Sequence, residues 1–383
     1  MTILLSDPRV RTRPAGPCLD IDLAAVAANT RLLAARANGS LMAVVKADGL
    51  GHGAVDVART ALAHGATSLG VTSLAEAWPL RDAGLTAPVL SWLNPVDADF
   101  AEAVRRDVAV AVPGLEHLAA VAAAPGRARI HLQIDAGMAR DGAAPSAWPR
   151  LCRAARRAEL RGEVEVVGLM GHLGCSDDPD DTCNRLGRSR FAWALESARA
   201  CALRPAQRHL AATAATLTDP LSHHTMSRVG AGLVGIDPSR TTTLHPPMTL
   251  TAPLVSVRRV RAGTPVGYGH GYRTPLGTFL GLVPLGYADG LPRAASGRAE
   301  VQHRGRRRPV VGRISMDQLV VDLGEAGGEP GDVVTVFGPG GAGEPTVAEW
   351  AAWADTLEHE IVTGIGGRVA RRTRAVSHLR SVR

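Results

Sequence analysis

The chain has 383 residues, of which 45% are apolar, and a net charge of +7 at neutral pH. This length predicts two or three domains, or a barrel with one further domain, and the composition excludes a disordered chain and a disulfide-rich scaffold. No apolar run reaches the roughly 18 residues of a membrane span, and the N-terminus, MTILLSDPRVRTRP, is not a secretory signal. We therefore expect a cytoplasmic protein whose cysteines are reduced thiols. They are Cys18, Cys152, Cys175, Cys183 and Cys201.

Short apolar runs alternate with longer helical patterns over residues 13–240. Strands that alternate with helices indicate a parallel sheet, and eight strands close a (β/α)8 barrel. We therefore assign residues 13–240 to an α/β fold, a TIM-like (β/α)8 barrel. The eight expected strands are LMAVVKA, SLGVTS, PVLSWL, VAVAVP, RIHLQID, VVGLMGHL, RHLAATA and RVGAGLVGI.

Polar residues stand next to several of these expected strands. In a (β/α)8 barrel the active residues lie at the carboxyl ends of the strands, on one face. We expect the following residues to share that face: Lys46, Arg140, His172, Thr213 and Arg228.

The pattern changes over residues 241–383, where we expect a β-rich C-terminal domain. A Pro- and Thr-rich transition, TTTLHPPMTLTAPL, precedes segments with the period-2 alternation of strands. These segments are PLVSVRRVR, FLGLVPLGY, RPVVGRISMDQLVVDL and DVVTVFG, and a single helix, TVAEWAAWADTLEHEIVTGI, follows them. We also expect residues 1–12 to pack with this domain.

Lys46 is the only lysine among the 43 lysine and arginine residues. A guanidinium stays protonated, whereas a lysine amine can lose its proton and form a Schiff base. An isolated surface lysine is the alternative interpretation. The position of Lys46 at the end of an apolar strand pattern, SLMAVVKADGLGHG, favours a nucleophile.

The three tyrosines also cluster, since Tyr268, Tyr272 and Tyr287 all lie within GYGHGYRTPLGTFLGLVPLGYADG. Ordinary packing with a satisfied hydroxyl is the alternative, but the clustering indicates a polar task for this segment. The basic run HRGRRRP has no interleaved aromatic residues, so we expect a solvated hairpin and no nucleic-acid site.

The segment AVVKADGLGHG resembles the cofactor-lysine segment of the alanine racemases, which bind pyridoxal 5'-phosphate (PLP). The resemblance continues, in the family's order, through IHLQIDAGMARDG, GLMGHLG, HLAATAATL, MSRVGAGLVGI, VGYGHGY, LGYADGLPR and VGRISMDQ. It implies a homodimeric amino-acid racemase that interconverts L-alanine and D-alanine and binds neither a metal, nor nucleic acid, nor a membrane. The alternatives are a racemase of a larger amino acid, another PLP reaction such as decarboxylation, and a non-catalytic PLP-binding protein.

By this resemblance, Lys46 binds PLP covalently, and Tyr268 of the partner subunit is the second base. Racemisation removes a Cα proton on one face and returns a proton on the other, which needs one base on each face. A tyrosine with a pKa of about 10 needs nearby positive charge to act as a base at neutral pH. His172 and Arg228 resemble the pair that supplies this network.

Further roles also follow from the resemblance. Arg228 matches the arginine that faces the pyridine nitrogen of PLP. The residues that match the phosphate site are Thr213 and the backbone of Gly230 and Ala231, and those that match the substrate site are Arg140 and, from the partner subunit, Met316 and Asp317. A family access corridor matches Asp177, Tyr287, Arg293 and Arg313, for which ordinary surface residues are the alternative.

Three positions depart from the family pattern. Leu50 and Gly367 stand where the family has tyrosines that bind the phosphate, and Gln133 stands where many members carry a carbamylated lysine. Each lost hydrogen bond to a charged group is worth about 1–3 kcal/mol, so PLP is expected to bind less tightly. Gly367 is also expected to widen the pocket, unless a positive φ forbids a side chain there. We expect that the neutral amide of Gln133 can still form a hydrogen bond with Arg140.

Overall fold

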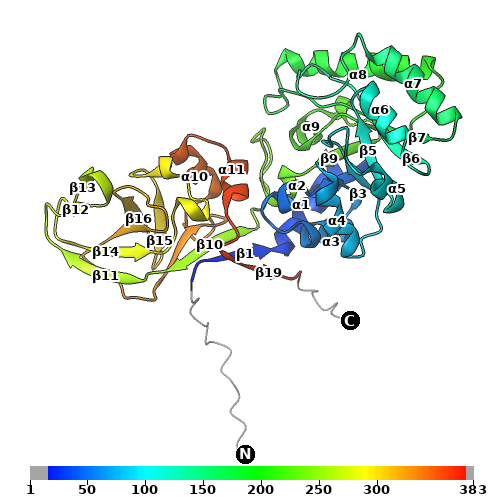
Figure 1. Cartoon of the computed structure of the whole chain (residues 1–383). Helices are drawn as coiled ribbons and strands as arrows, with labels where there is room; N and C mark the ends of the chain where they lie inside the picture. The colour runs from blue at the N-terminus through cyan, green and yellow to red at the C-terminus, as the bar shows by residue number, and fades with distance from the viewer. Residues whose placement is uncertain (1–15, 377–383) are drawn as a thin grey trace, which may run out of the picture. The chain divides into compact units, whose positions relative to one another are not determined.

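The computed structural model describes residues 16–376, which form two units (Figure 1). One unit spans Leu23–Pro246, and the other combines the segment up to Asp22 with Pro247–Ala375. The expected packing of residues 1–12 lies outside the described residues.

The first unit is an eight-stranded sheet in which every neighbouring pair is parallel. Its strand order is β8-β7-β6-β5-β4-β3-β2-β9. Backbone hydrogen bonds from Arg228 N to Ala211 O (3.0 Å) and from Thr225 N to Arg208 O (3.1 Å) link the chain at the two outer strands, so the barrel is nearly closed. The strands are β2 (Ser40–Val44), β3 (Ala66–Val71), β4 (Val89–Ser91), β5 (Val108–Val112), β6 (Ala128–Gln133), β7 (Val164–Met170), β8 (Gln207–His209) and β9 (Met226–Val229). The expected (β/α)8 fold is confirmed.

Helices follow the barrel strands along the chain (Figure 1). Their apolar faces are buried: in α1, for example, Val26, Ala27 and Leu33 have no exposed surface. Short polar side chains begin several of them, as where Ser73 accepts a hydrogen bond from Glu76 N. The helices are α1 (Leu23–Arg36), α2 (Lys46–Leu50), α3 (Ala54–Ala63), α4 (Leu74–Asp82), α5 (Phe100–Arg105), α6 (Leu115–Ala122), α7 (Trp148–Leu160), α8 (Thr182–Ala200) and α9 (Thr213–Thr218), with the 3-10 turns η1 (Pro220–Ser222) and η2 (Ala231–Val234).

Two expectations for this unit are wrong. The segment RVGAGLVGI was expected to be a strand, but the strand ends at Val229 and η2 follows. The Thr213 hydroxyl accepts hydrogen bonds from the backbone N–H groups of Gly230 and Gly232, and these bonds turn the chain out of the sheet. The barrel also does not begin at residue 13, because β1 (Cys18–Asp22) pairs with strands of the other unit.

The second unit contains a nine-stranded sheet of order β11-β14-β17-β16-β15-β18-β10-β1-β19 and the short pair β12-β13. Most of its pairs are antiparallel; β1 and β19 pair in parallel. The strands after β1 are β10 (Met248–Pro253), β11 (Ser256–Val260), β12 (Pro265–Val266), β13 (Tyr272–Arg273), β14 (Thr278–Val283), β15 (Glu300–His303), β16 (Arg306–Val311), β17 (Leu319–Gly324), β18 (Val333–Phe337) and β19 (Ala370–Arg374). Its helical turns are η3 (Tyr268–His270), η4 (Tyr287–Asp289), η5 (Arg293–Ala295), α10 (Val347–Ala354) and α11 (Glu358–Gly364).

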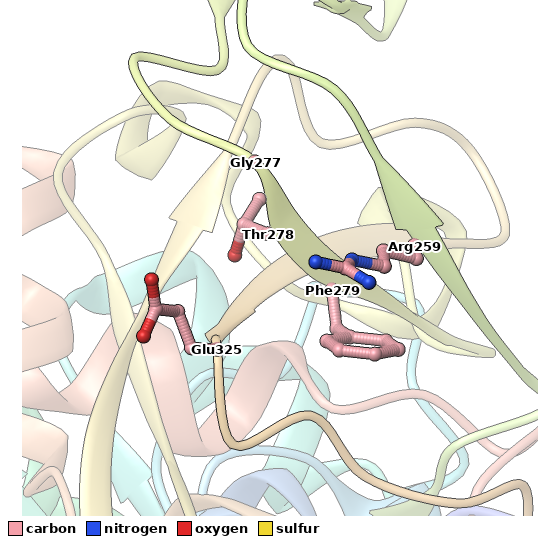
Figure 2. Close-up of a pocket in the computed structure, with 5 residues that line it drawn as sticks. All are labelled: Arg259, Gly277, Thr278, Phe279 and Glu325. Carbon is pink, nitrogen blue, oxygen red and sulfur yellow. The ribbon is translucent and has the colours of Figure 1, made fainter.

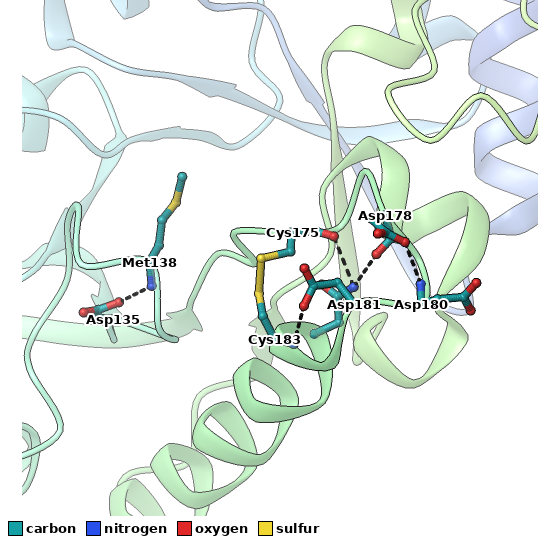
Figure 3. The surroundings of a disulfide bond; sticks show 8 residues. Asp135, Met138, Cys175, Asp178, Asp180, Asp181 and Cys183 are labelled. Atoms are coloured by element: carbon teal, nitrogen blue, oxygen red, sulfur yellow. Dashed lines mark hydrogen bonds between the residues drawn. A yellow bond between two sulfur atoms is a disulfide. The ribbon is translucent and has the colours of Figure 1, made fainter.

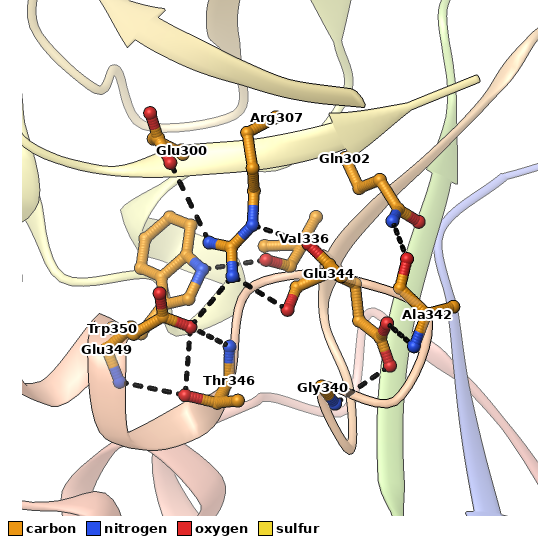
Figure 4. A network of polar contacts seen from close by, with 11 residues as sticks. Glu300, Gln302, Arg307, Val336, Gly340, Ala342, Glu344, Thr346, Glu349 and Trp350 are labelled. Atoms are coloured by element: carbon orange, nitrogen blue, oxygen red, sulfur yellow. Dashed lines mark hydrogen bonds and ion pairs between the residues drawn. The ribbon is translucent and has the colours of Figure 1, made fainter. Parts of the chain in front are cut away.

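The expected single C-terminal helix is two helices, because Asp355 adopts the left-handed conformation (φ 56°) between α10 and α11. The expected basic hairpin is present: Arg304 and Gly305, both with positive φ, join β15 to β16. In this hairpin Arg307 donates to Glu349 Oε2 at 3.0 Å and to the Glu344 carbonyl at 2.9 Å (Figure 4). These bonds tie the hairpin to α10.

A cavity of about 270 Å³ opens on this unit and is lined by Arg259, Gly277, Thr278, Phe279 and Glu325 (Figure 2). None of the expected site residues lines it. Across residues 16–376, no helix is both long and apolar enough to cross a membrane.

Gly168 in β7 is required by the barrel interior. A Cβ atom at this position would overlap the His131 ring, which is 2% exposed. We predict that Gly168→Ala lowers the free energy of unfolding by about 1–3 kcal/mol, the usual cost of overpacking, as measured by urea denaturation. The control is Gly114→Ala, whose Cβ would meet no atom within 4 Å on an extended backbone (φ −168°). Equal stability of the two variants would contradict this assignment.

Candidate active site

Lys46 stands directly at the carboxyl end of β2 and is exposed, whereas the five residues before it are buried. The turn after it is left-handed: Ala47, Asp48 and Leu50 have φ of 51°, 52° and 53°. Such a conformation costs a non-glycine residue roughly 1–2 kcal/mol. Hydrogen bonds within the turn, such as that from Gly51 N to Ala47 O at 2.9 Å, offset part of this cost.

The Glu76 carboxylate joins this turn to the end of β3. It accepts hydrogen bonds from Ala47 N at 2.8 Å, from Thr72 N at 2.8 Å and from the Thr72 hydroxyl at 2.7 Å. Burial raises the pKa of the Glu76 carboxyl, but these hydrogen bonds outweigh it, so its pKa lies below the ordinary value. An ionised Glu76 therefore holds the residue that follows Lys46.

Arg228 lies in β9 with 5% of its surface exposed, and its terminal nitrogens are fully engaged. They donate to the carbonyl oxygens of Gly171 at 2.8 Å, His209 at 2.8 Å and Leu210 at 3.3 Å. They also donate to Nδ1 of His209 at 3.0 Å and Nδ1 of His172 at 3.2 Å. The guanidinium thus fastens the ends of β7, β8 and β9 together.

Within residues 16–376, no carboxylate pairs with Arg228 and its Nε–H has no hydrogen-bond partner. Burial lowers the pKa of Arg228 to about 10, so it stays charged at neutral pH. A buried charge without a counter-ion is costly. The site therefore offers one unused cationic donor to the acceptor atom of a ligand.

The Arg228 contact fixes the tautomers of two buried histidines. Because a guanidinium only donates, His209 Nδ1 must accept, and the neutral ring then carries its proton on Nε2. This Nε2–H donates to His131 Nδ1 at 2.8 Å. Burial, aided by the charges of Arg129 and Arg228, lowers the pKa of His131 to about 3, which keeps that ring neutral.

The pKa of His172 is lowered by its burial and by three positively charged side chains. Burial lowers its pKa to about 3, and the charges of Arg228, Arg140 and Lys46 contribute to the shift in that order. Of these charged groups, Arg228 contacts the His172 ring, with its Nη2 3.2 Å from Nδ1. The placement of Lys46 and Arg140 on the same face as His172 stays a prediction.

Arg140 is exposed and follows a turn built on Asp135. Asp135 Oδ1 accepts hydrogen bonds from the backbone N–H groups of Gly137, Met138 and Ala139 (2.8–3.1 Å). Our expectation for Gln133 is wrong, because its amide donates to Asp141 Oδ2 at 3.0 Å rather than bonding Arg140. Its buried Oε1 has no partner in the described part of the chain.

Thr213 begins α9 and is 4% exposed. Its oxygen accepts from Gly230 N at 3.3 Å and Gly232 N at 3.2 Å, which leaves its hydroxyl proton to donate. A Cβ at Gly230 would lie 3.2 Å from Val44 O, so this turn is close to the end of β2. Ala231 opens η2 beside it.

The expected residues of the second unit lie in its loops. Tyr268 in η3 is 72% exposed and Met316 is 53% exposed. Asp317 pairs with Arg368 (2.7 Å), which also pairs with Asp289 (3.1 Å). Arg368 is therefore shared between two carboxylates of its own unit.

The two tyrosine-replacing positions differ in their surroundings. Leu50 is 5% exposed and left-handed, so it belongs to the packed turn. Gly367 has no positive φ, and a Cβ there would meet nothing within 4 Å. The backbone of Gly367 therefore accepts a side chain.

The expectation that all cysteines are reduced is wrong for one pair, since Cys175 and Cys183 form a disulfide (Figure 3). Cys18, Cys152 and Cys201 are free thiols. Sequence reasoning also missed Glu76, His131 and His209. The sequence held a signal for the two histidines, because each lies next to apolar residues in an expected strand: His131 between Ile130 and Leu132, and His209 before Leu210.

Comparison with known proteins accounts for both units. Residues 21–238 match the alanine racemase N-terminal domain, and residues 247–373 match the alanine racemase C-terminal domain. Fold and site thus define a two-domain isomerase. The alanine racemase of Frankia casuarinae is 45% identical over 366 residues, covering 93% of this chain and 95% of that protein. The alanine racemase of Thermobifida fusca is 45% identical over 359 residues, covering 92% and 96%.

Solved structures agree. An alanine racemase from a D-cycloserine-producing Streptomyces lavendulae superposes with a TM-score of 0.92 at 43% identity, covering 95% of this chain and 98% of that one. The alanine racemase of Streptomyces coelicolor gives 0.91 at 44% identity, covering 94% and 98%. The chain belongs to the alanine racemase family.

The neutral His131 makes the stability depend on pH. Its folded pKa of about 3 lies below the ordinary 6.5, so only the unfolded chain takes up the proton as pH falls below 6.5. This group should remove about 2 kcal/mol from the free energy of unfolding between pH 7 and pH 5. The test variant is His131→Asn, whose side chain can still accept a hydrogen bond from His209. Between pH 7 and pH 5, we predict that its free energy of unfolding, measured by urea denaturation, falls by about 2 kcal/mol less than that of the wild type. Identical pH dependence would show that His131 is not kept neutral.

Proposed function

We propose that the protein is an alanine racemase that interconverts L-alanine and D-alanine with PLP, and that it works as a cytoplasmic homodimer. The observation that carries the proposal is identity of 45% over 92–93% of the chain to proteins named alanine racemase. The single lysine, placed at the end of the first barrel strand, supports it. Alanine is thus favoured over the larger substrates that an open Gly367 would admit.

The barrel residues fit PLP. The unused Nε–H of the buried Arg228 suits the pyridine nitrogen. The hydroxyl proton of Thr213 suits a phosphate oxygen, with the backbone N–H of Ala231 beside it, whereas the Gly230 N–H already donates to the Thr213 oxygen. When bound, PLP supplies an electron sink that makes the Cα proton of an amino acid acidic. Arg228 keeps its own proton, because its pKa of about 10 leaves it charged at neutral pH.

Lys46 and Tyr268 of the partner subunit are the two bases. The Lys46 amine takes up or returns the Cα proton on one face, and the Tyr268 phenol does so on the other. Glu76 orients the Lys46 backbone through Ala47 N. His172, held neutral beside Arg228, is the acceptor that orders this end of the site.

The substrate carboxylate is bound by Arg140, with the Met316 backbone and Asp317 contributed by the partner subunit. Asp135 holds the Arg140 loop through three backbone hydrogen bonds. The ion pair with Arg368, which is shared with Asp289, reduces the repulsion between the Asp317 carboxylate and the substrate carboxylate.

The test is racemisation of L-alanine by PLP-loaded protein, followed by chiral analysis, beside serine and larger amino acids. Borohydride should fix PLP to the peptide that contains Lys46 and nowhere else. Lys46→Arg keeps the charge but cannot supply a neutral amine, so it should lose both the adduct and the activity. A stable adduct in Lys46→Arg, or no racemisation by the wild type, would refute the proposal.

The shared site makes a separate prediction. Tyr268→Phe should retain PLP and lose activity by about 10²–10⁴-fold, the contribution of a positioned base. Random exchange of equal amounts of Lys46→Ala and Tyr268→Phe subunits should restore about a quarter of wild-type activity, because half of the dimers then hold one intact site. Inactive mixed dimers, with exchange verified by native mass spectrometry, would place Tyr268 in the same subunit's site or outside it.

A further inference from the structure

A disulfide closes the loop between β7 and α8 into a ring (Figure 3). Cys175 follows His172 by three residues, and Cys183 stands in the first turn of α8, with Cα atoms 6.3 Å apart. Both residues are half-buried, so small thiols can reach them. We infer that Cys175 and Cys183 are a reversible thiol–disulfide site that controls the affinity for the substrate carboxylate; the substrate in this inference rests on the proposed function.

The ring contains several negative charges, whose mutual repulsion opposes ring closure. Between the two cysteines the sequence is SDDPDDT, with four aspartates and no basic residue. Like charges in a short loop repel one another. Without the disulfide, hydrogen bonds restrain the ring: the Asn184 side chain donates to Cys175 O at 3.2 Å and Asp178 O at 2.9 Å, and Asp178 N donates to Cys175 O at 3.1 Å. Because reduction removes the covalent link while the like charges remain, it should loosen the ring.

Residues on both sides of the ring lie beside the loop that carries Arg140. A Cβ built on Gly174, next to Cys175, would lie 3.7 Å from Met138 Cγ. On α8, a Cβ at Gly187 would lie 3.3 Å from Ala136 O. Figure 3 draws Met138 on this neighbouring loop. A loosened ring removes packing from one side of the Arg140 loop, so it should weaken carboxylate binding without touching Lys46.

The exchange needs only a small disulfide and its thiol, such as oxidised and reduced glutathione. A Cys175 or Cys183 thiolate attacks one sulfur of the small disulfide and releases one thiolate. The second protein thiolate then attacks the mixed disulfide and releases the other. Two electrons pass from the protein thiols to the small disulfide, and the two protein protons go to the released thiolates. The reverse sequence opens the ring.

The observed bond and the proposed cytoplasmic location together favour a reversible disulfide. The protein is proposed for a reducing compartment, where disulfides are transient and redox-sensing, yet the structure joins this pair. Cys175, Cys183 and Asp181 also offer three ligand atoms within 4.8 Å of one another, which makes a metal site the competing explanation of the same cluster.

The experiment equilibrates the PLP-loaded enzyme in oxidised or reduced glutathione, then alkylates free thiols for peptide mass spectrometry and measures racemisation of L-alanine. In the oxidised buffer Cys175 and Cys183 should escape alkylation while Cys201 reacts. Reduction should raise KM for L-alanine about fivefold or more with little change in kcat, as expected for a coupling that acts on binding. The same loss should appear in propionate binding measured by calorimetry.

The variants separate the switch from a general structural effect. Cys183→Ser should show the high KM in both buffers, whereas Cys201→Ser, at the other end of α8, should respond as the wild type does. Full alkylation of the pair in oxidised buffer, or an unchanged KM and propionate affinity, would overturn the inference. Zinc that binds at one equivalent, blocks alkylation and is lost in Cys183→Ser would replace it with a metal site. Absent racemisation in both buffers would instead refute the proposed function, because alkylation and propionate binding still report on the ring.

Discussion

The barrel is organised around a buried positive charge that has no carboxylate to neutralise it within the described residues. The terminal N–H groups of Arg228 donate hydrogen bonds to carbonyl oxygens and histidine nitrogens at the ends of β7, β8 and β9. These contacts close the sheet at its outer strands, and they require His209 and His172 to stay neutral. The guanidinium that holds these strand ends together can also donate to the acceptor atom of a ligand. Arg228 therefore serves both the stability of the barrel and the binding of a ligand.

The neighbouring strand β2, which pairs with β9, leads into a strained turn that is held in place by a carboxylate. The turn after Lys46 adopts a left-handed conformation that ordinary residues avoid, and Glu76 holds its first peptide in place. Burial lowers the pKa of His172, and the positive charges of Arg228, Arg140 and Lys46 lower it further. Positive charges suit a ligand with a phosphate and a carboxylate. The acidic ring closed by Cys175 and Cys183 is fastened covalently, and the residues that flank it lie beside the Arg140 loop.

Much of this arrangement could be predicted from the sequence. Alternation of apolar strands with helical patterns determined the eight-stranded barrel, because burial on both faces of a parallel sheet leaves a continuous apolar run. The single lysine singled out Lys46 as the candidate nucleophile, since an arginine cannot supply a deprotonated amine. The hairpin at Arg304 and Gly305 and the β-rich second unit followed from local turn chemistry and period-2 alternation.

Only the tertiary structure decided what depends on pairing between distant residues. The β1 strand has the same local pattern whichever sheet it joins, and it joins the second unit by pairing with β10 and β19. The His131–His209 contact spans 78 residues and exists because the register of two strands and the absence of a Cβ at Gly168 leave room for it. Cysteine connectivity is likewise invisible in sequence. Pattern and composition report the local backbone and its burial, whereas side-chain partners are set by register and packing, which the folded chain alone determines.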